Sequence, residues 1–110
     1  MLSIIIPAYN EEQCIKRAYN AIHSLLAENN IESEFIFVND GSSDRTHEII
    51  NELSSEQDNI IGLHFSRNFG KESAISAGLA AVSGNCAVVI DCDLQHPPEK
   101  IIEMYHLGEQ

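Results

Sequence analysis

Basic residues are scarce in this chain of 110 residues. Six lysines and arginines face seventeen aspartates and glutamates, and the formal net charge is −11 with histidine neutral. A field of that sign repels phosphate backbones, so we expect no nucleic-acid partner. A phosphorylated ligand would need a metal ion or a local pair of basic side chains beside it.

Cysteines and long apolar runs are also few. The three cysteines are odd in number and form no C-x-x-C pair, which favours free thiols in a reducing cytoplasm over a disulfide framework. No stretch approaches the roughly 20 apolar residues of a membrane span, and the apolar start is too short for a signal peptide. We therefore expect a cytoplasmic chain, and its length fits one domain.

Four short apolar runs, rich in β-branched residues, alternate with helical patterns. The runs cover residues 2–8, 35–38, 60–65 and 87–90, the last led by Cys86. Apolar runs without alternation are typical of strands buried on both faces of a parallel sheet. The helical patterns cover residues 15–26, 46–53, 71–82 and a segment from Pro98 onwards. The order βαβαβαβα predicts an α/β fold with a mostly parallel, Rossmann-like sheet.

The helix starts carry recognisable caps. Asn10, with Gln13 three residues later, has the spacing of a capping box before the first helix. Ser43 or Asp44 is expected to cap the second helix. Pro98 suits the first turn of the fourth.

Polar segments follow all four expected strands, at residues 7–12, 39–44, 66–71 and 91–98. The opposite strand ends look like plain turns. In an open α/β sheet, ligands bind beyond the carboxyl ends of the strands. The sequence therefore predicts a functional site at this edge of the sheet.

Asp91 and Asp93 stand two apart at the end of the fourth strand, so both carboxylates project to the same side. Such hard oxygen ligands suit Mg²⁺ or Mn²⁺ carrying a substrate diphosphate. The pair could equally be turn-forming aspartates ahead of the next helix, and the spacing alone leaves both open.

The other polar segments are individually ambiguous. Gly41 permits a tight turn after Asp40, and the helix start that follows could receive a ligand or merely be capped. Arg67 and Lys71 flank the start of the third helix and could meet diphosphate oxygens, or form a solvated face. Tyr9 could stack on a base or cover the sheet edge. The histidines do not cluster at metal-ligand spacing.

These segments together resemble glycosyltransferase family 2, an inverting, metal-dependent family with the GT-A nucleotide-sugar-binding fold. The matching stretches are residues 3–12, 38–44 and 91–93. Two more, residues 66–72 and 93–99, look like the polyprenyl-phosphate branch, which includes dolichol-phosphate mannose synthases and bactoprenol glucosyltransferases.

The resemblance implies a role for each matching position. In the family pattern one group of residues lines the nucleoside pocket, one residue binds the base, and others hold the diphosphate and a divalent cation, Mg²⁺ or Mn²⁺. The implied positions are Pro7, Tyr9 and Glu11 for the nucleoside, Asp40 for the base, Asp91 for ribose and diphosphate, Asp93 with Gln95 and Asp91 for the metal, and Arg67 and Lys71 for the edge of the nucleotide site. The chain departs from the family pattern at Asn39 and His96, where acids are common.

The resemblance also implies an activity. The family would transfer a sugar from a UDP-glucose or GDP-mannose type of donor to a polyprenyl phosphate or another glycan or lipid acceptor. Such a step belongs to cell-wall or polysaccharide biosynthesis at the cytosolic face of a membrane. The family's general base matches nothing here and is expected beyond Gln110. Residues 1–110 are therefore expected to be the N-terminal, donor-binding part of a truncated transferase domain, without efficient turnover.

Other functions remain open at this point. The chain could be a nucleotide-binding fragment without catalysis, or a haloacid-dehalogenase-like phosphatase that uses Asp91 and Asp93 as nucleophile and acid. In that phosphatase the motif follows the first strand, whereas here it follows the fourth. A retaining glycosidase also uses two acids, at about 5–5.5 Å, but generally needs a larger cleft. A free edge strand leaves a homo-oligomer possible.

Overall fold

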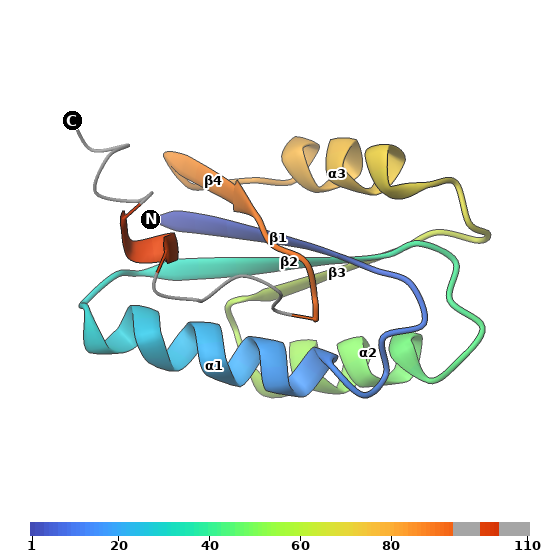
Figure 1. Ribbon diagram of the computed structural model, residues 1–110, viewed down its shortest axis with the longest axis horizontal. Coiled ribbons are helices and arrows are strands. Elements are labelled where there is room, and N and C mark those ends of the chain that lie inside the picture. The colour runs from blue at the N-terminus through green and yellow to red at the C-terminus, as the bar shows by residue number, and fades with distance from the viewer. Residues whose placement is uncertain (94–99, 104–110) are drawn as a thin grey trace.

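A four-stranded, fully parallel sheet organises the chain in the order β3-β2-β1-β4 (Figure 1). The computed structural model describes residues 1–93 and 100–103. The predicted α/β alternation is confirmed. The elements are β1 (Leu2–Ala8), α1 (Ile15–Glu28), β2 (Ser33–Asn39), α2 (Thr46–Glu56), β3 (Ile60–His64), α3 (Lys71–Ala80) and β4 (Cys86–Val89), and residues 100–103 are also helical.

The helices cover both faces of this sheet. Helices α1 and α2 lie on one face and α3 lies on the other (Figure 1). From β1 the chain moves outward through β2 to β3, then crosses over by α3 to place β4 on the opposite side of β1. The order of the strands therefore reverses between β1 and β4. In open α/β sheets, ligand-binding crevices form at such a reversal point.

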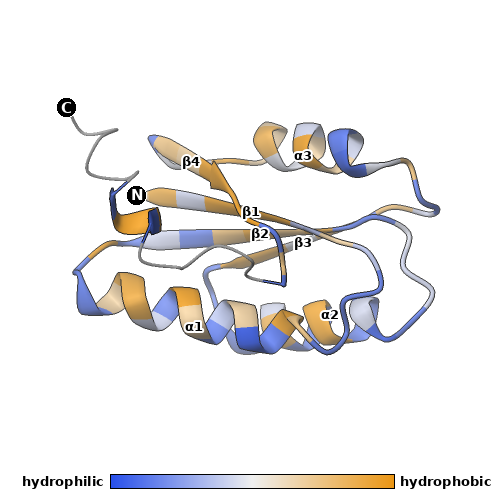
Figure 2. Cartoon of the chain, viewed as in Figure 1, coloured by the Kyte–Doolittle hydropathy of each residue, from blue (hydrophilic) through white to orange (hydrophobic). Residues whose placement is uncertain are grey.

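Strand β1 is buried on both faces, which explains its unbroken apolar run. Ile4 and Ile6 pack in the larger core beneath α1 and α2. Ile5 points the other way, into a smaller core with Val38 and Ala74 under α3. Successive side chains of a strand face opposite sides, so only a strand covered on both sides needs apolar residues at every position. Figure 2 shows the hydrophobic strands between mixed-polarity helices.

One predicted helix cap is wrong. Helix α1 begins at Ile15 with Cys14 at the cap position and no side-chain cap. The Asn10 side chain instead accepts hydrogen bonds from the Ser43 and Asp44 amides, at 2.8 and 3.3 Å. Asn10, whose backbone is in the left-handed region with a φ of 53°, thus stabilises the turn after β2 instead of capping α1.

The second helix start is closer to its prediction. The Thr46 amide donates to the Asp44 carboxylate at 2.9 Å, although Arg45 occupies the cap position. The predicted start of the fourth helix at Pro98 lies outside the described residues. Among residues 1–93 and 100–103, no helix is long and apolar enough to cross a membrane.

Candidate functional site

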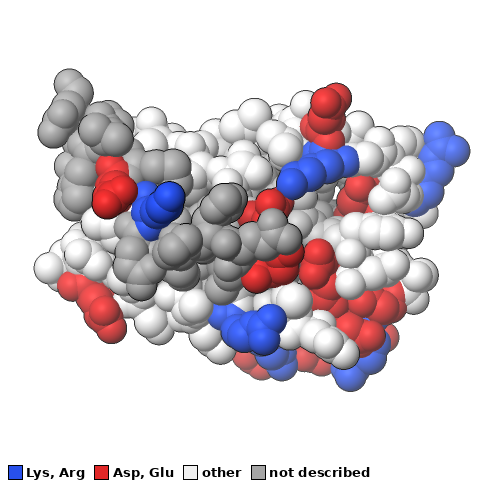
Figure 3. All heavy atoms as spheres, viewed as in Figure 1, with Lys and Arg blue, Asp and Glu red and all other residues white. Residues whose placement is uncertain are grey.

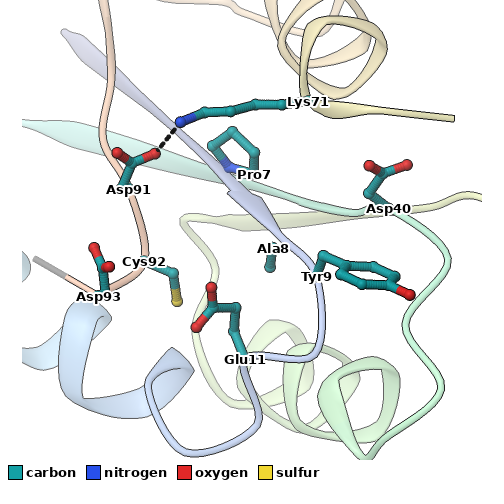
Figure 4. Close-up of a pocket in the computed structure, with 9 residues that line it drawn as sticks. All are labelled: Pro7, Ala8, Tyr9, Glu11, Asp40, Lys71, Asp91, Cys92 and Asp93. Atoms are coloured by element: carbon teal, nitrogen blue, oxygen red, sulfur yellow. Dashed lines mark hydrogen bonds and ion pairs between the residues drawn. The ribbon is translucent and has the colours of Figure 1, made fainter. Parts of the chain in front are cut away.

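A cleft of about 280 Å³ opens at the carboxyl ends of β1 and β4, at the reversal point of the sheet (Figure 4). Its walls come from the loop after β1, the end of β2, the start of α3 and the segment after β4. The lining residues are Pro7, Ala8, Tyr9, Glu11, Asp40, Lys71, Asp91, Cys92 and Asp93. Seven of the predicted site residues therefore share one cleft. Arg67 is not among the lining residues, and Gln95 lies outside the described part of the chain.

Among the described residues that line the cleft, Lys71 is basic, whereas Glu11, Asp40, Asp91 and Asp93 are acidic. Its Nζ lies 2.6 Å from Asp91 Oδ1, and the two side chains are 59% and 41% exposed. A pair this exposed adds little to stability. The pair instead keeps the ammonium group of Lys71 in the cleft lining, between the start of α3 and the segment after β4 (Figure 4). On the face shown in Figure 3, acidic side chains gather near the middle and toward the lower right, and basic side chains border that group.

The donor set of the cleft fits a magnesium-like ion. Asp91 and Asp93 both line it, and Asp93 is exposed. Mg²⁺ is commonly bound by one or two carboxylates together with substrate phosphates and water, rather than by a complete protein cage. Within the described ranges no group of three or more His, Cys, Asp or Glu side chains forms such a cage. The two aspartates would therefore hold the ion together with oxygens of the ligand.

The loop that carries Tyr9 and Glu11 is fixed by the neighbouring turn. The Glu11 amide donates to Thr46 Oγ1 at 2.9 Å, and the Glu12 amide donates to Asp44 Oδ2 at 3.2 Å. Burial by itself raises the pKa of Asp44, but hydrogen bonds from Thr46 and the Glu12 amide outweigh it and leave the pKa below its ordinary value. The ionised carboxylate thus holds two loops together. Sequence reasoning missed this interlock because its partners are more than 30 residues apart.

Asp40 is buried, at 4% exposure, and its carboxylate is already engaged. It accepts hydrogen bonds from the Phe69 amide at 2.8 Å, the Gly70 amide at 3.1 Å and Asn68 Nδ2 at 3.2 Å. A carboxylate offers about four acceptor sites, which leaves room for one contact to a ligand. The sequence singled out Asp40 but gave no sign of these loop partners.

Arg67 takes part in an aromatic contact instead of lining the cleft. Its guanidinium carbon lies 4.7 Å from the centroid of the Phe69 ring, and Phe69 is half exposed. A cation over an aromatic face is attracted to the ring. Arg67 is exposed in the loop before α3, and its predicted role at the edge of a nucleotide site stays a prediction.

The thiol of Cys92 is unreactive at neutral pH. It is 2% exposed, and burial, together with the nearby Glu11, raises the pKa of its thiol to about 12. Only the thiolate is a good nucleophile or metal ligand. At neutral pH Cys92 is therefore a packing residue between the two aspartates.

A histidine network supports the end of β2. Asn39 Nδ2 donates to His64 Nδ1 at 3.1 Å, since an amide nitrogen can only donate, and His64 Nε2 therefore carries the proton that Asn51 Oδ1 accepts at 3.0 Å. The His47 ring stacks on His64 with centroids 3.8 Å apart. Asn39 Oδ1 in turn accepts the Ser42 amide at 3.0 Å. A neutral His64 thus helps to shape the turn beside Asp40.

This network predicts a pH-dependent stability. Burial, and then the stacked His47, lower the pKa of His64 below its ordinary value near 6.5. As the pH falls below about 6.5, His64 is protonated more readily in the unfolded chain than in the folded one. The contribution of His64 to the free energy of unfolding is therefore fully present above about pH 6.5 and declines as the pH falls further. We expect the urea midpoint to drop across that range, and to drop less in His64→Gln.

The matched control for this prediction is His23→Gln. His23 stacks on Tyr19 on α1, away from the network, so its replacement should leave the pH profile of the parent unchanged. Equal profiles for the parent and His64→Gln, measured by circular dichroism between pH 5 and 8, would contradict the assignment.

Sequence comparisons with known proteins all indicate the same protein family. The family model described as "Glycosyl transferase family 2" matches residues 3–109. An uncharacterized glycosyltransferase of Bacillus subtilis, YkcC, is 46% identical over 102 residues, covering 93% of this chain and 32% of the relative. The bactoprenol glucosyl transferase of Shigella phage SfV is 41% identical over 110 residues, covering 97% and 36%. The chain thus spans about a third of the length of these relatives.

Solved structures share the fold. S. aureus TarS 1-349 superposes with a TM-score of 0.76 at 22% identity, over 98% of this chain and 32% of that one. The mannosyltransferase PcManGT from Pyrobaculum calidifontis, solved with GDP-Man and Mn²⁺, gives 0.72 at 22% identity, over 84% and 27%. Glucosyl-3-phosphoglycerate synthase from Mycobacterium tuberculosis, solved with UDP, gives 0.68 at 29% identity, over 93% and 37%.

Proposed function

The chain belongs to glycosyl transferase family 2, and we propose that it binds the nucleotide-sugar donor of an inverting, metal-dependent sugar transfer. The observation that carries this proposal is the cleft at the sheet reversal, where a half-exposed aromatic ring, carboxylates and one ammonium group meet. An acidic chain needs a cation to hold a diphosphate, and Lys71 together with a divalent ion between Asp91 and Asp93 would provide it.

The two sides of the cleft suit the two halves of a nucleotide. On one side lie Tyr9 and Asp40, and on the other Lys71 and Asp91 (Figure 4). Tyr9 is 49% exposed and offers a face on which a base can stack. We place the nucleoside against Pro7 at the end of β1 and Glu11 in the loop that follows, with the remaining acceptor site of Asp40 available to a base donor.

The diphosphate would then lie toward the end of β4. Asp91 and Asp93 would hold Mg²⁺ or Mn²⁺, and Gln95, outside the described residues, would complete the protein's ligands. When bound, the ion neutralises the charge that develops on the departing diphosphate. Lys71 would supply a second positive charge to the same oxygens, and Arg67 a third at the outer edge of the site.

The acceptor side of the reaction rests on the relatives. Several of them are named bactoprenol glucosyl transferases, and we propose a polyprenyl phosphate as acceptor, at the cytosolic face of a membrane. Inverting transfer needs a general base beside the acceptor. We propose that this base comes from the part of the relatives' length that this chain does not span, so that the chain alone binds the donor without efficient transfer.

Calorimetric titration tests the proposal. UDP, GDP, UDP-glucose and GDP-mannose are each titrated with and without Mn²⁺. Affinity for one nucleotide series that depends on the metal supports donor binding. Affinity that is unchanged by metal or chelator contradicts it, and hydrolysis of p-nitrophenyl phosphate would favour the phosphatase alternative.

Lys71 gives a second test, because its removal should have two opposite effects. Without the ammonium group, Asp91 loses a competing cation, so Lys71→Ala should bind Mn²⁺ alone more tightly. The same variant should bind the metal–nucleotide pair about tenfold more weakly, since it loses a charge-assisted contact to the diphosphate.

Lys16→Ala is the matched control for Lys71→Ala. Lys16 is an exposed lysine on α1 that pairs with Glu52 at 3.3 Å, away from the cleft. It should change neither affinity. If the Mn²⁺ and nucleotide affinities of Lys71→Ala move in the same direction, Lys71 does not serve both partners.

A further inference from the structure

We propose that Asp40 is a positioning residue, whose carboxylate holds the loop before α3 and thereby sets Lys71 at the diphosphate. This inference rests on the donor-binding function proposed above, and it adds to the base contact that the resemblance implies for Asp40. It follows from what the carboxylate touches within the chain itself.

The contacts of Asp40 link three segments of the chain. Its own amide donates to the Ala8 carbonyl oxygen at 2.9 Å, which ties it to β1. Its Oδ1 accepts the Phe69 amide at 2.8 Å, and its Oδ2 accepts the Gly70 amide at 3.1 Å. Asn68 Nδ2 lies 3.2 Å from Oδ2 and 3.3 Å from the Asp40 carbonyl oxygen. One buried residue therefore joins β1, β2 and the loop from β3 to α3.

The loop held by Asp40 leads directly into Lys71. Gly70 occupies the cap position of α3, with a φ of 103° and no side-chain cap of its own, and Lys71 is the first residue of that helix. The Asp40 carboxylate, which follows β2, accepts the amide of this cap residue. An anion at a helix N-terminus is also favoured by the helix dipole. The direction in which Lys71 leaves the helix start thus depends on Asp40.

Charge alone predicts the opposite of this positioning role. Asp40→Asn removes one negative charge from an acidic cleft, and by Coulomb's law an anion should then bind more tightly. An asparagine, however, presents one acceptor oxygen, and its NH₂ group would face an amide that also donates. If Asp40 positions the loop, the loop loosens and anion binding weakens. The two interpretations therefore differ in the sign of the effect.

Inorganic pyrophosphate with Mn²⁺ is the appropriate probe, because it has no base. We expect Asp40→Asn to bind it about tenfold more weakly than the parent by calorimetry, the loss of about one charge-assisted contact. In a Lys71→Ala background the same change should cost less than about twofold, since the side chain that Asp40 positions is already gone. Asp58→Asn is the control: Asp58 is exposed between α2 and β3, and its replacement removes the same charge.

Hydrogen exchange of the ligand-free chain separates this inference from the proposed function. The Phe69 and Gly70 amides should exchange at least about tenfold faster in Asp40→Asn, while amides of β1 keep the rates of the parent. Unchanged exchange at Phe69 and Gly70 would overturn the inference, as would pyrophosphate affinity equal to or above that of the parent. Should the parent bind no pyrophosphate, the donor-binding function fails, and the exchange rates still decide whether Asp40 holds the loop.

Discussion

Asp93→Asn should lose about 100-fold or more of the Mn²⁺-dependent affinity for UDP or GDP while unfolding at the same urea concentration as the parent. Asp93 is exposed and lines the cleft just after β4, so the substitution removes a charge without disturbing a core. Loss of a residue that merely supports a metal ligand typically costs 10–100-fold, and loss of a ligand should cost at least as much. Calorimetric titration at saturating metal and without metal measures the two nucleotide affinities, and urea unfolding measures the stability.

The metal-free titration makes this prediction specific. Asp93→Asn should leave the weak, metal-free nucleotide affinity unchanged, and Asp58→Asn, the matched change on an exposed surface, should leave both affinities unchanged. If the metal-free affinity falls as much as the metal-dependent one, Asp93 contacts the nucleotide itself. Equal affinities of mutant and parent with metal present would remove Asp93 from the site.

Sequence patterns predict the sheet well because a strand buried on both faces has an unbroken run of apolar residues. The run of Ile4, Ile5 and Ile6 reports two helical layers, and β1 has the expected bounds. The pattern fails where burial is polar. Strand β2 begins at Ser33, two residues before its predicted start. It includes the buried Glu34, whose carboxylate accepts hydrogen bonds from the Ser3 hydroxyl at 2.8 Å and the Ser83 amide at 2.7 Å. No local periodicity encodes partners that far away.

The location of the candidate site follows from topology, but its internal connections do not. Parallel strands bring their carboxyl ends to one edge, so Tyr9, Asp40 and Asp91 meet in one cleft although they are far apart in sequence. The partners of Asn10 and Asp40, by contrast, lie about 30 residues away along the chain. Local sequence propensity predicted that Asn10 caps the helix that follows it. In the structure its side chain instead accepts hydrogen bonds from a loop more than 30 residues away.

Gly41→Ala should reduce the free energy of unfolding by about 2–4 kcal/mol, a large share of the stability of a small domain. Gly41 has a φ of +70°, which an L-residue adopts at a cost of about 1–2 kcal/mol. A Cβ atom there would lie 2.1 Å from the carbonyl carbon of Arg67 and 2.4 Å from the Asn68 nitrogen. Those are backbone atoms, so the turn and the loop must move apart.

Gly70→Ala separates the two contributions to this loss. Gly70 also has a positive φ, of 103°, but nothing lies within 4 Å of its would-be Cβ. The Gly70 variant should therefore incur backbone strain alone and lose less stability than Gly41→Ala in urea unfolding. Equal losses would mean that the close approach of the two loops contributes nothing. Because the loop at Arg67 and Asn68 continues into Phe69 and Gly70, which Asp40 binds, the displacement in Gly41→Ala should also weaken nucleotide binding in the molecules that remain folded.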